Sequence, residues 1–293
     1  MSKIVCFGEV LWDVFPDGKK IGGAPLNVAL RLSSLNNNST IISSVGNDDL
    51  GRELIRNLKD TNVNIEGLQT TNNYKTSEVV VTLDKSGSAT YTIEQPCAWD
   101  FIEHTNKLKK ITEEAEVFIY GSLASRMQTT YATLLKLISV ASFKVFDVNL
   151  RKPHYNMECI IELMKYADLI KFNEEELTEI CDYYNFKSDS IDALCAHISN
   201  QTNTKHICVT LGDKGALYYK DDKVFRNYGY KVKVKDTVGA GDSFLASFID
   251  GISNRLNEEE ILDRSCAIGA LVASKNGANP KLNQTEIENL MVS

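Results

Sequence analysis

The stretch Asp236-Thr237-Val238-Gly239-Ala240-Gly241-Asp242-Ser243-Phe244 decides how the rest of the chain is interpreted. Before it, residues 231–235 alternate between lysine and valine, and this period of two predicts a strand. After it, apolar residues recur on one face of an expected helix, at Phe244, Leu245, Phe248, Ile249 and Ile252. Two glycines and an alanine therefore separate an expected strand from an expected helix.

Glycines at the start of a helix suit the binding of a phosphate. They let backbone N–H groups come close to a ligand, and the first N–H groups of a helix lack partners and lie at its positive end. Asp242 is unexpected there, because a carboxylate repels phosphate. A general base for a hydroxyl that attacks the phosphate would explain it. A capping Asp after an ordinary Gly-x-Gly turn is the alternative.

Composition and charge limit the class of protein. The 293 residues are 43% hydrophobic and 24% charged, which is ordinary for a globular chain. This length suits one large α/β domain with an extra element, or two small domains. The net charge of −7 argues against a nucleic-acid or membrane-surface partner, and no run of about 18 apolar residues predicts a membrane span.

Cysteine usage and the N-terminus indicate a cytoplasmic location. The seven cysteines are scattered, odd in number and without a Cys-x-x-Cys pair, so we expect reduced thiols and no metal site built from cysteine. The chain enters an expected buried strand at residues 3–8 without a signal-peptide pattern.

Short apolar runs with polar carboxyl ends recur along the chain. They are residues 3–8, 117–121, 144–149, 168–173 and 206–212, and from residue 101 helical stretches separate them. The alternation predicts an α/β fold with a doubly wound, mostly parallel sheet flanked by helices. The polar ends of the strands should meet at one edge of the sheet, where ligands bind in such folds.

Residues 77–94 follow a different pattern. Two alternating runs surround the turn sequence Lys85-Ser86-Gly87-Ser88 and predict a β-hairpin. The residues expected on its apolar face are Val79, Val81, Leu83, Ala89, Tyr91 and Ile93. Because the hairpin interrupts strand and helix patterns of another kind, we expect it in a separate small sheet.

A second glycine pair, Gly22-Gly23, precedes a helix expected to begin near Pro25, since proline is tolerated in a first turn. The bare backbone would let a polar ligand approach. Asn27, in the first turn, can both donate and accept hydrogen bonds. A plain tight turn explains the two glycines equally well.

Both glycine-containing stretches resemble signatures of the ribokinase-like (PfkB) sugar kinases. Residues 236–244 resemble the family's C-terminal signature, and residues 21–30 resemble its N-terminal one. Between them, Asp147–Arg151, Asn173–Glu176 and Thr210–Gly215 match the motifs D-x-N-x-R, N-x-x-E and T-x-G-x-x-G, in the family's order. The absence of Gly-Lys-Ser/Thr after the glycines distinguishes the stretch from a Walker loop.

The resemblance implies a single kinase domain over residues 1–293, with a β lid formed by about 10–24 and 74–98. A cover that closes over the sugar keeps water out of phosphoryl transfer. Since a two-stranded hairpin alone is marginally stable, its apolar face is expected to pack on the same element of a second chain. We therefore expect a homodimer formed through the lids.

The resemblance also implies roles for individual residues. Asp242 would take the proton of a primary sugar hydroxyl, and the backbone of Gly239, Ala240 and Gly241, together with Arg151, would stabilise the transferred phosphoryl group. The residues implied to bind the sugar are Asp13, Gly23, Asn27, Arg151 and Asp242.

ATP and Mg²⁺ are the cofactors that the resemblance implies. Around the nucleotide it places Asn173, Thr210, Gly212, Lys214, Gly215, Gly239, Gly241, Cys266 and Asn276. Asn173 and Glu176 would hold the Mg²⁺–phosphate assembly, largely through water, as Mg²⁺ prefers. Capping of the following helix explains Asn173 and the adjacent glutamates without a metal.

A monovalent cation is a further property of the family. Asp236 and Val238, with the 275–281 loop, match the positions of its cation site. Lys281 stands where small polar residues are usual, and this departure argues against activation by K⁺. A lysine ammonium in place of the ion is the alternative, and the sequence leaves the choice open.

Three segments resemble bacterial fructokinases most within the family: Gly8 through Asp13, Gly22 through Asn27, and Gly121 through Ala124. Fructose, giving fructose 6-phosphate, is therefore the expected substrate. Ketodeoxygluconate kinases usually carry Gly-Gly-Asp-Thr where this chain has Gly23-Ala24-Pro25, and phosphofructokinases need more basic residues. The sequence is also compatible with a ribokinase, a nucleoside kinase or a catalytically silent sugar sensor on the same fold.

Overall fold

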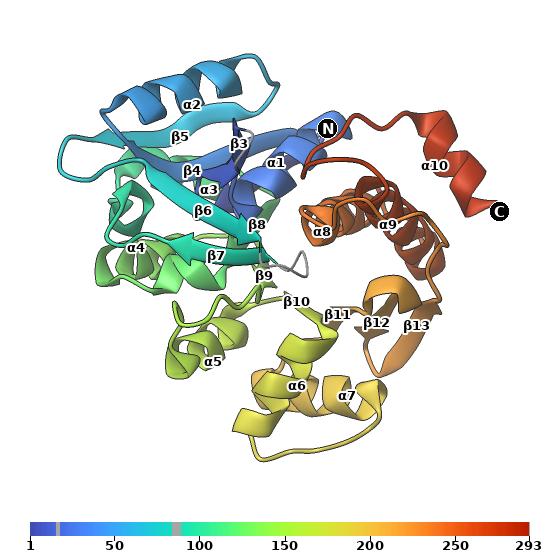
Figure 1. Ribbon diagram of the computed structural model, residues 1–293. Helices are drawn as coiled ribbons and strands as arrows, with labels where there is room; N and C mark the ends of the chain where they lie inside the picture. Colours follow the sequence, from blue (N-terminus) through green and yellow to red (C-terminus); the bar gives the residue numbers. More distant parts are fainter. Residues whose placement is uncertain (16–17, 84–88, 293) are drawn as a thin grey trace.

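The computed structural model describes residues 1–15, 18–83 and 89–292. Within them a nine-stranded sheet forms the centre of the molecule, and a four-stranded sheet stands apart from it (Figure 1). The strands of the main sheet, in spatial order, are β13 (Lys223–Asn227), β12 (Ala216–Lys220), β11 (His206–Thr210), β10 (Leu169–Asn173), β9 (Phe143–Asp147), β8 (Val117–Gly121), β1 (Lys3–Phe7), β4 (Asn38–Gly46) and β5 (Asn64–Thr71).

The main sheet is parallel from β5 to β11, and only β12 and β13 pair antiparallel at one edge. After β1, the next two strands of the main sheet, β4 and β5, are added on one side of β1. The chain then crosses to the other side of β1, where β8, β9, β10 and β11 follow in order. The doubly wound, mostly parallel sheet expected from the sequence is therefore confirmed. The direction of winding reverses between β1 and β8, and ligands bind at such a point in open α/β sheets.

Helices cover both faces of the sheet, because successive strand residues point to opposite faces. In β1, Val5 and Phe7 join one apolar core, whereas Ile4 and Cys6 join the other. The first core is covered by α3 (Asn106–Glu113), α4 (Gln128–Ile138), α5 (Met157–Tyr166), α6 (Glu174–Tyr183) and α7 (Ile191–Thr202). The second is covered by α1 (Ala24–Ser34), α2 (Asp49–Lys59), α8 (Ala240–Ser253) and α9 (Glu258–Ala273).

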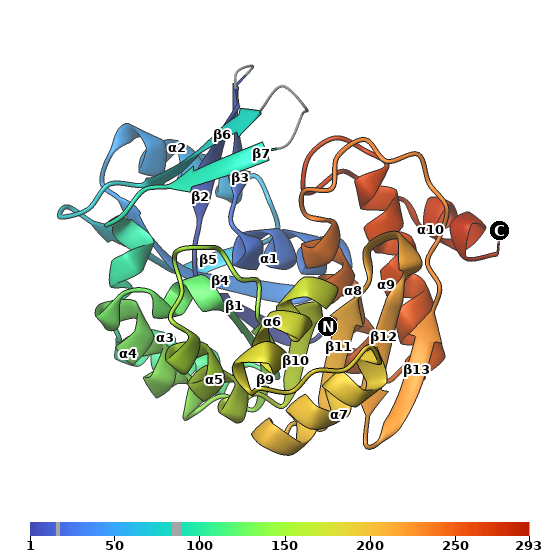
Figure 2. The same ribbon diagram turned by 60° about the horizontal axis from the view of Figure 1, so that its bottom comes forward.

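The small sheet contains the expected hairpin, and its strand order is β3 (Gly18–Gly22), β2 (Leu11–Phe15), β6 (Ser77–Leu83) and β7 (Ala89–Ile93). β6 and β7 pair antiparallel, with Val79 opposite Ile93. The predicted turn at Lys85–Ser88 lies outside the described residues. In Figure 2 the small sheet stands beside α1 and projects from the main sheet.

The strand predicted at residues 231–235 is wrong. The chain is irregular there, and none of the described strands pairs with it. Val234 is 58% exposed, so the alternation of lysine and valine marks no buried face. Instead, the N–H groups of Lys235 and Asp236 donate to the Ala273 carbonyl at the end of α9.

The C-terminal region contains a helix that the pattern did not reveal. The expected helix near 258–274 is α9, but α10 (Gln284–Met291) follows it and packs on it through Ile287. Asn283 and Glu286 form the reciprocal capping bonds at its start. No helix in the described part of the chain is long and apolar enough to cross a membrane.

Candidate active site

The stretch 236–244 forms the expected start of a helix. α8 begins at Ala240 after Gly239, whose φ of 74° lies in the left-handed region. A Cβ added to Gly239 would stand 2.5 Å from the carbonyl oxygen of Ala278. Glycine is therefore required here both for its conformation and for this close approach. The Ala240 N–H donates to the Thr237 carbonyl at 3.2 Å, and the first N–H groups of a helix in general lack intrahelical partners and suit an anion.

Asp242 is connected to both ends of the chain by amide side chains. Asn27 Nδ2, in the first turns of α1, donates to Asp242 Oδ2 at 2.8 Å. Asn279 Nδ2 donates in turn to Asn27 Oδ1 at 2.8 Å. Burial raises the pKa of Asp242 to about 6, and the charge of Asp147 adds to this effect. A carboxylate with a pKa near 6 is ionised at neutral pH and still basic enough to accept a proton.

Asp13 lies beside the glycine pair that precedes α1. A Cβ on Gly22 would stand 2.1 Å from Asp13 Oδ2, so only glycine leaves room for this carboxylate. Burial raises the pKa of Asp13 to about 6, with a further contribution from Asp242 and an opposing one from Arg151. Asp13 and Asp242 therefore share one electrostatic environment beside Gly22.

Glu9 is a buried acid that the predicted set of site residues lacked. Its Oε1 accepts a hydrogen bond from the Ala24 N–H at 3.2 Å, at the start of α1. Its Oε2 is buried and has no hydrogen-bond partner among the described residues. Burial raises the pKa of Glu9 to about 7. The only sequence signal was a charged residue directly after a buried strand, at Gly8-Glu9.

A small cavity lies at the point where the direction of winding reverses. It is lined by residues from the ends of β1, β8 and β9 and from the start of α1, among them Glu9, Ala24, Ser122 and Asn149. The cavity adjoins the Glu9 carboxyl and lies where the topology places a ligand site.

Arg151 is exposed, at the end of the D-x-N-x-R segment. Its Nη1 donates to the Leu150 carbonyl, and no described acidic side chain forms an ion pair with it. Its charge nevertheless lowers the pKa values of Glu9, Asp13 and Asp242. Such an exposed guanidinium near three carboxyl groups is suited to meet an incoming phosphate.

Asn173 and Glu176 form a capping box at the start of α6. Asn173 Oδ1 accepts from the Glu176 N–H at 2.8 Å, and Glu176 Oε2 accepts from the Asn173 N–H at 2.9 Å. Glu176 Oε1 also accepts from the Leu150 N–H at 3.0 Å. Both carboxylate oxygens therefore have backbone partners, and each keeps one lone pair for a water. This donor set fits Mg²⁺ held through water and provides no bare carboxylate for direct ligation.

Apart from Gly239 and Gly241 at the start of α8, the predicted nucleotide residues fall into two groups. Thr210 is paired with Asn173 in adjacent strands, so the structure brings these two motifs together. Gly212 and Lys214 follow in an exposed turn, and the Lys214 ammonium lies 3.7 Å from Glu174. Gly215 is buried, and a Cβ there would stand 2.1 Å from the Asn227 carbonyl, so packing alone explains this glycine.

The remaining nucleotide residues lie at α9. Cys266 is buried in the middle of this helix, whereas Asn276 follows its end and is exposed. The neighbouring Gly277 N–H donates to Asp236 Oδ2 at 2.9 Å, which places the 275–281 loop against the stretch before α8.

The predicted monovalent-cation residues are engaged in bonds within the chain. Asp236 Oδ1 accepts from the Val238 N–H at 3.0 Å, and Asp236 Oδ2 accepts from Gly277. The carbonyl of Lys281 accepts from the Lys275 ammonium at 3.1 Å. Each Asp236 oxygen therefore has one backbone donor and keeps one lone pair.

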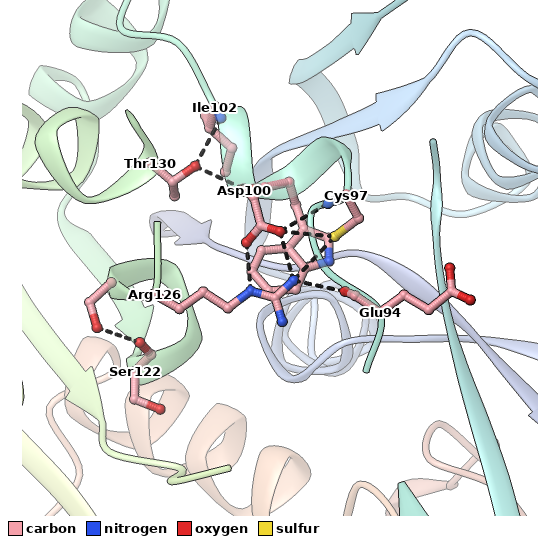
Figure 3. Close-up of polar contacts among 9 residues, drawn as sticks. Glu94, Cys97, Asp100, Ile102, Ser122, Arg126 and Thr130 are labelled. Atoms are coloured by element: carbon pink, nitrogen blue, oxygen red, sulfur yellow. Dashed lines mark hydrogen bonds and ion pairs between the residues drawn. The ribbon is translucent and has the colours of Figure 1, made fainter. Parts of the chain in front are cut away.

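The buried side chain of Arg126 contacts the segment that follows β7 and connects the small sheet to the rest of the chain (Figure 3). Arg126 Nε and Nη2 donate to the two oxygens of Asp100 at 2.6 and 2.7 Å, and its guanidinium stacks over Trp99 at 3.8 Å. Nη2 also donates to the Glu94 carbonyl, just beyond β7. The end of the hairpin is thus connected to the segment after β8 through one side chain.

Comparison with known proteins places the chain in a family. The model of the pfkB family carbohydrate kinases matches residues 1–285. A probable fructokinase-5 of Arabidopsis thaliana is 32% identical, over 95% of this chain and 94% of that protein. A fructokinase of Solanum tuberosum is 31% identical, over 98% of this chain and 94% of that protein.

A solved structure shows the same fold. The fructokinase of Vibrio cholerae O395, in a form with bound fructose, ADP and calcium ion, matches 99% of each chain with a TM-score of 0.86 and 27% identity. The protein described here belongs to the pfkB family of carbohydrate kinases, and the family resemblance inferred from its motifs is confirmed.

Proposed function

We propose that this kinase transfers the γ-phosphoryl group of ATP to a primary hydroxyl of fructose and forms fructose 6-phosphate and ADP. The observation that carries the proposal is Asp242 at the anion-binding start of α8, held by Asn27 at 2.8 Å. The substrate is supported by the fructokinase relatives and by the ligand-bound Vibrio cholerae structure.

In the proposed reaction, different residues transfer the proton, stabilise the phosphoryl group and bind the sugar. Asp242 accepts the proton of the sugar hydroxyl while the hydroxyl oxygen forms a bond to the γ-phosphorus of ATP. The bond between the γ-phosphorus and the bridging oxygen breaks, and ADP leaves with that oxygen. N–H groups at the start of α8 and the guanidinium of Arg151 stabilise charge on the transferred group. Asp13 and Asn27 bind sugar hydroxyls beside the Gly22-Gly23 backbone. When bound, Mg²⁺ neutralises phosphate charge, and Asn173 and Glu176 hold it through water.

The proposal extends to the lid, the cation and the assembly. The small sheet, β3-β2-β6-β7, closes over the sugar and pairs with the same sheet of a second chain, giving a homodimer. Activation by K⁺ is not part of the proposal, because Lys281 stands where small polar residues are usual in the family. The seven free cysteines support a reducing, cytoplasmic location.

An assay of ADP release with fructose, ribose, ketodeoxygluconate and adenosine tests the substrate. The highest kcat/KM is expected with fructose, because a site that hydrogen-bonds hydroxyls rejects analogues lacking them. A preference for ketodeoxygluconate or adenosine would overturn the substrate and leave phosphoryl transfer standing. Light scattering tests the assembly, and a monomeric mass would overturn the lid dimer.

A further inference from the structure

A lysine lies buried beneath the start of α8, where no sequence motif had pointed. Lys171 is in β10, and its side chain is 7% exposed. A Cβ added to Gly241, in the first turn of α8, would meet Lys171 Nζ at 3.7 Å. We propose that Lys171 is a positioning residue for phosphoryl transfer, whose ammonium supplies positive charge beneath the anion-binding turn. The proposal rests on the phosphoryl transfer described above.

The surroundings of Lys171 make a purely structural role a poor explanation. Its strand neighbours Leu169, Ile170 and Phe172 are fully buried apolar residues, so an apolar residue would fit the pattern of a central strand. Lys171 Nζ donates to Asp147 Oδ1 at 3.0 Å. A buried ion pair of this kind adds little net stability compared with a well-packed apolar pair. The cost of burying the ammonium therefore needs another reason.

The charges near Lys171 provide that reason. The carboxylates of Asp147, Glu176 and Asp242 all act on the ammonium. The Lys171 ammonium offsets the negative charge that these acids would present to an incoming polyphosphate. The ammonium in turn lowers the pKa of Asp242.

A second lysine in the same sheet is a matched control. Lys144, in β9, forms an ion pair of 2.8 Å with Asp168, just before β10. The pair of Lys144 and Asp168 lies at the amino ends of β9 and β10, whereas the pair of Lys171 and Asp147 joins the same two strands nearer their carboxyl ends. Carboxyl ends, not amino ends, face the ligand site in a parallel sheet. Substitution of Lys144 therefore removes a similar ion pair without changing the charge beneath α8.

The experiment compares D147N with K171M/D147N, two variants that differ only in the ammonium. Neither variant leaves the Asp147 carboxylate buried without the Lys171 ammonium, so both should fold, which thermal unfolding checks. We expect kcat to be about tenfold to a hundredfold lower in K171M/D147N than in D147N, the scale of one lost electrostatic contact in a buried site. K144M should keep kcat within about threefold of the wild type, since its pair lies far from the reacting groups.

Binding supplies a readout that needs no sugar. The dissociation constants of ADP and of a non-hydrolysable ATP analogue are measured by calorimetry for both variants. The loss of Lys171 should weaken the analogue about tenfold more than ADP, because the charge acts on the third phosphate. Equal kcat in the two variants, or equal weakening of both nucleotides, would overturn the proposal. If the wild type phosphorylates no sugar tested, the proposed function fails and the binding comparison still decides the role of Lys171.

Discussion

Asn27 Nδ2 donates a hydrogen bond to Asp242 Oδ2 at 2.8 Å, across 215 residues of chain. The contact joins the start of α1 to the start of α8, and the carbonyl of Pro280 accepts from Arg31 on the same helix α1. A sugar held by Asn27 would thus contact the same group that orients the base. A substitution of Asn27 or of Asp242 is therefore expected to change both the position of the sugar hydroxyl and the orientation of the base.

The role of Asp242 can be tested with D242N. The substituted side chain is nearly isosteric and keeps an oxygen for Asn27, so the fold and nucleotide binding should persist. Turnover should fall by roughly 10²-fold to 10⁴-fold, the usual effect of a lost general base. D250N is the control on the same helix: Asp250 accepts from Asn37 and pairs with Arg264, so its loss should lower stability and spare kcat. Turnover of D242N within about threefold of the wild type excludes Asp242 as the base.

Substitution of Glu176 separates capping from metal binding. E176Q places an amide N–H₂ against a backbone N–H of Asn173 or Leu150, so we expect a loss of about 1–2 kcal/mol in the free energy of unfolding. If Glu176 also orients Mg²⁺ through water, the Mg²⁺ concentration for half-maximal rate should rise. E260Q is the matched control, since Glu260 forms an exposed capping box with Asn257. A stability loss with unchanged Mg²⁺ dependence would leave capping as the only role.

The rate of the reaction should depend on pH through the acids at the site. The raised pKa of Asp242, about 6, means that protonation removes the base as the pH falls through this value. kcat/KM for sugar should therefore be constant above pH about 7 and decline roughly tenfold for each unit well below 6. Asp13, with a pKa also near 6, should steepen the decline. A profile that is flat from pH 8 to 5 contradicts the assignment.

The buried carboxyl of Glu9 should make stability depend on pH. Its pKa is about 7 in the folded chain against an ordinary 4.5, so the folded state binds the proton more tightly. Its contribution to stability is therefore lost as the pH rises from about 4.5 to 7. E9Q removes this titration and should raise the free energy of unfolding by about 3 kcal/mol at pH 8, with little change at pH 4.5. Urea unfolding at both pH values checks it, and an equal effect at both would refute it.

Arg126 should be required for stability and for the position of the small sheet. R126M leaves Asp100, which is fully buried, without its partner and should cost about 3–5 kcal/mol in unfolding free energy. Since Arg126 also contacts the Glu94 carbonyl beyond β7, KM for the sugar should rise more than kcat falls. R52M, which removes an exposed pair with Asp49, should change stability by less than about 1 kcal/mol. A similar small change in R126M would show that the buried pair is dispensable.

Local pattern was sufficient for much of the fold and for the centre of the site. Apolar runs with polar ends predicted the strands β1, β8, β9, β10 and β11, and the glycine-rich stretches predicted the starts of α1 and α8. These features depend on neighbours within a few residues, because period and capping are local properties. The motifs in order also identified Asp242 and Asn27, which the structure brings into contact.

Only the tertiary structure decided which strand has a partner and which buried charges meet. The alternation at 231–235 has the period of a strand, but a strand also needs a partner strand and a buried face. Residues 231–235 belong to neither of the two described sheets, and Val234 is exposed. Lys171 appears in the sequence as one polar residue in an apolar run, and its place under Gly241 depends on how α8 packs on β10. Glu9, Asn279 and Arg126 likewise acquire their partners from segments far along the chain. Burial and electrostatic coupling depend on distances in space between residues, and the spacing of residues along the sequence does not give those distances.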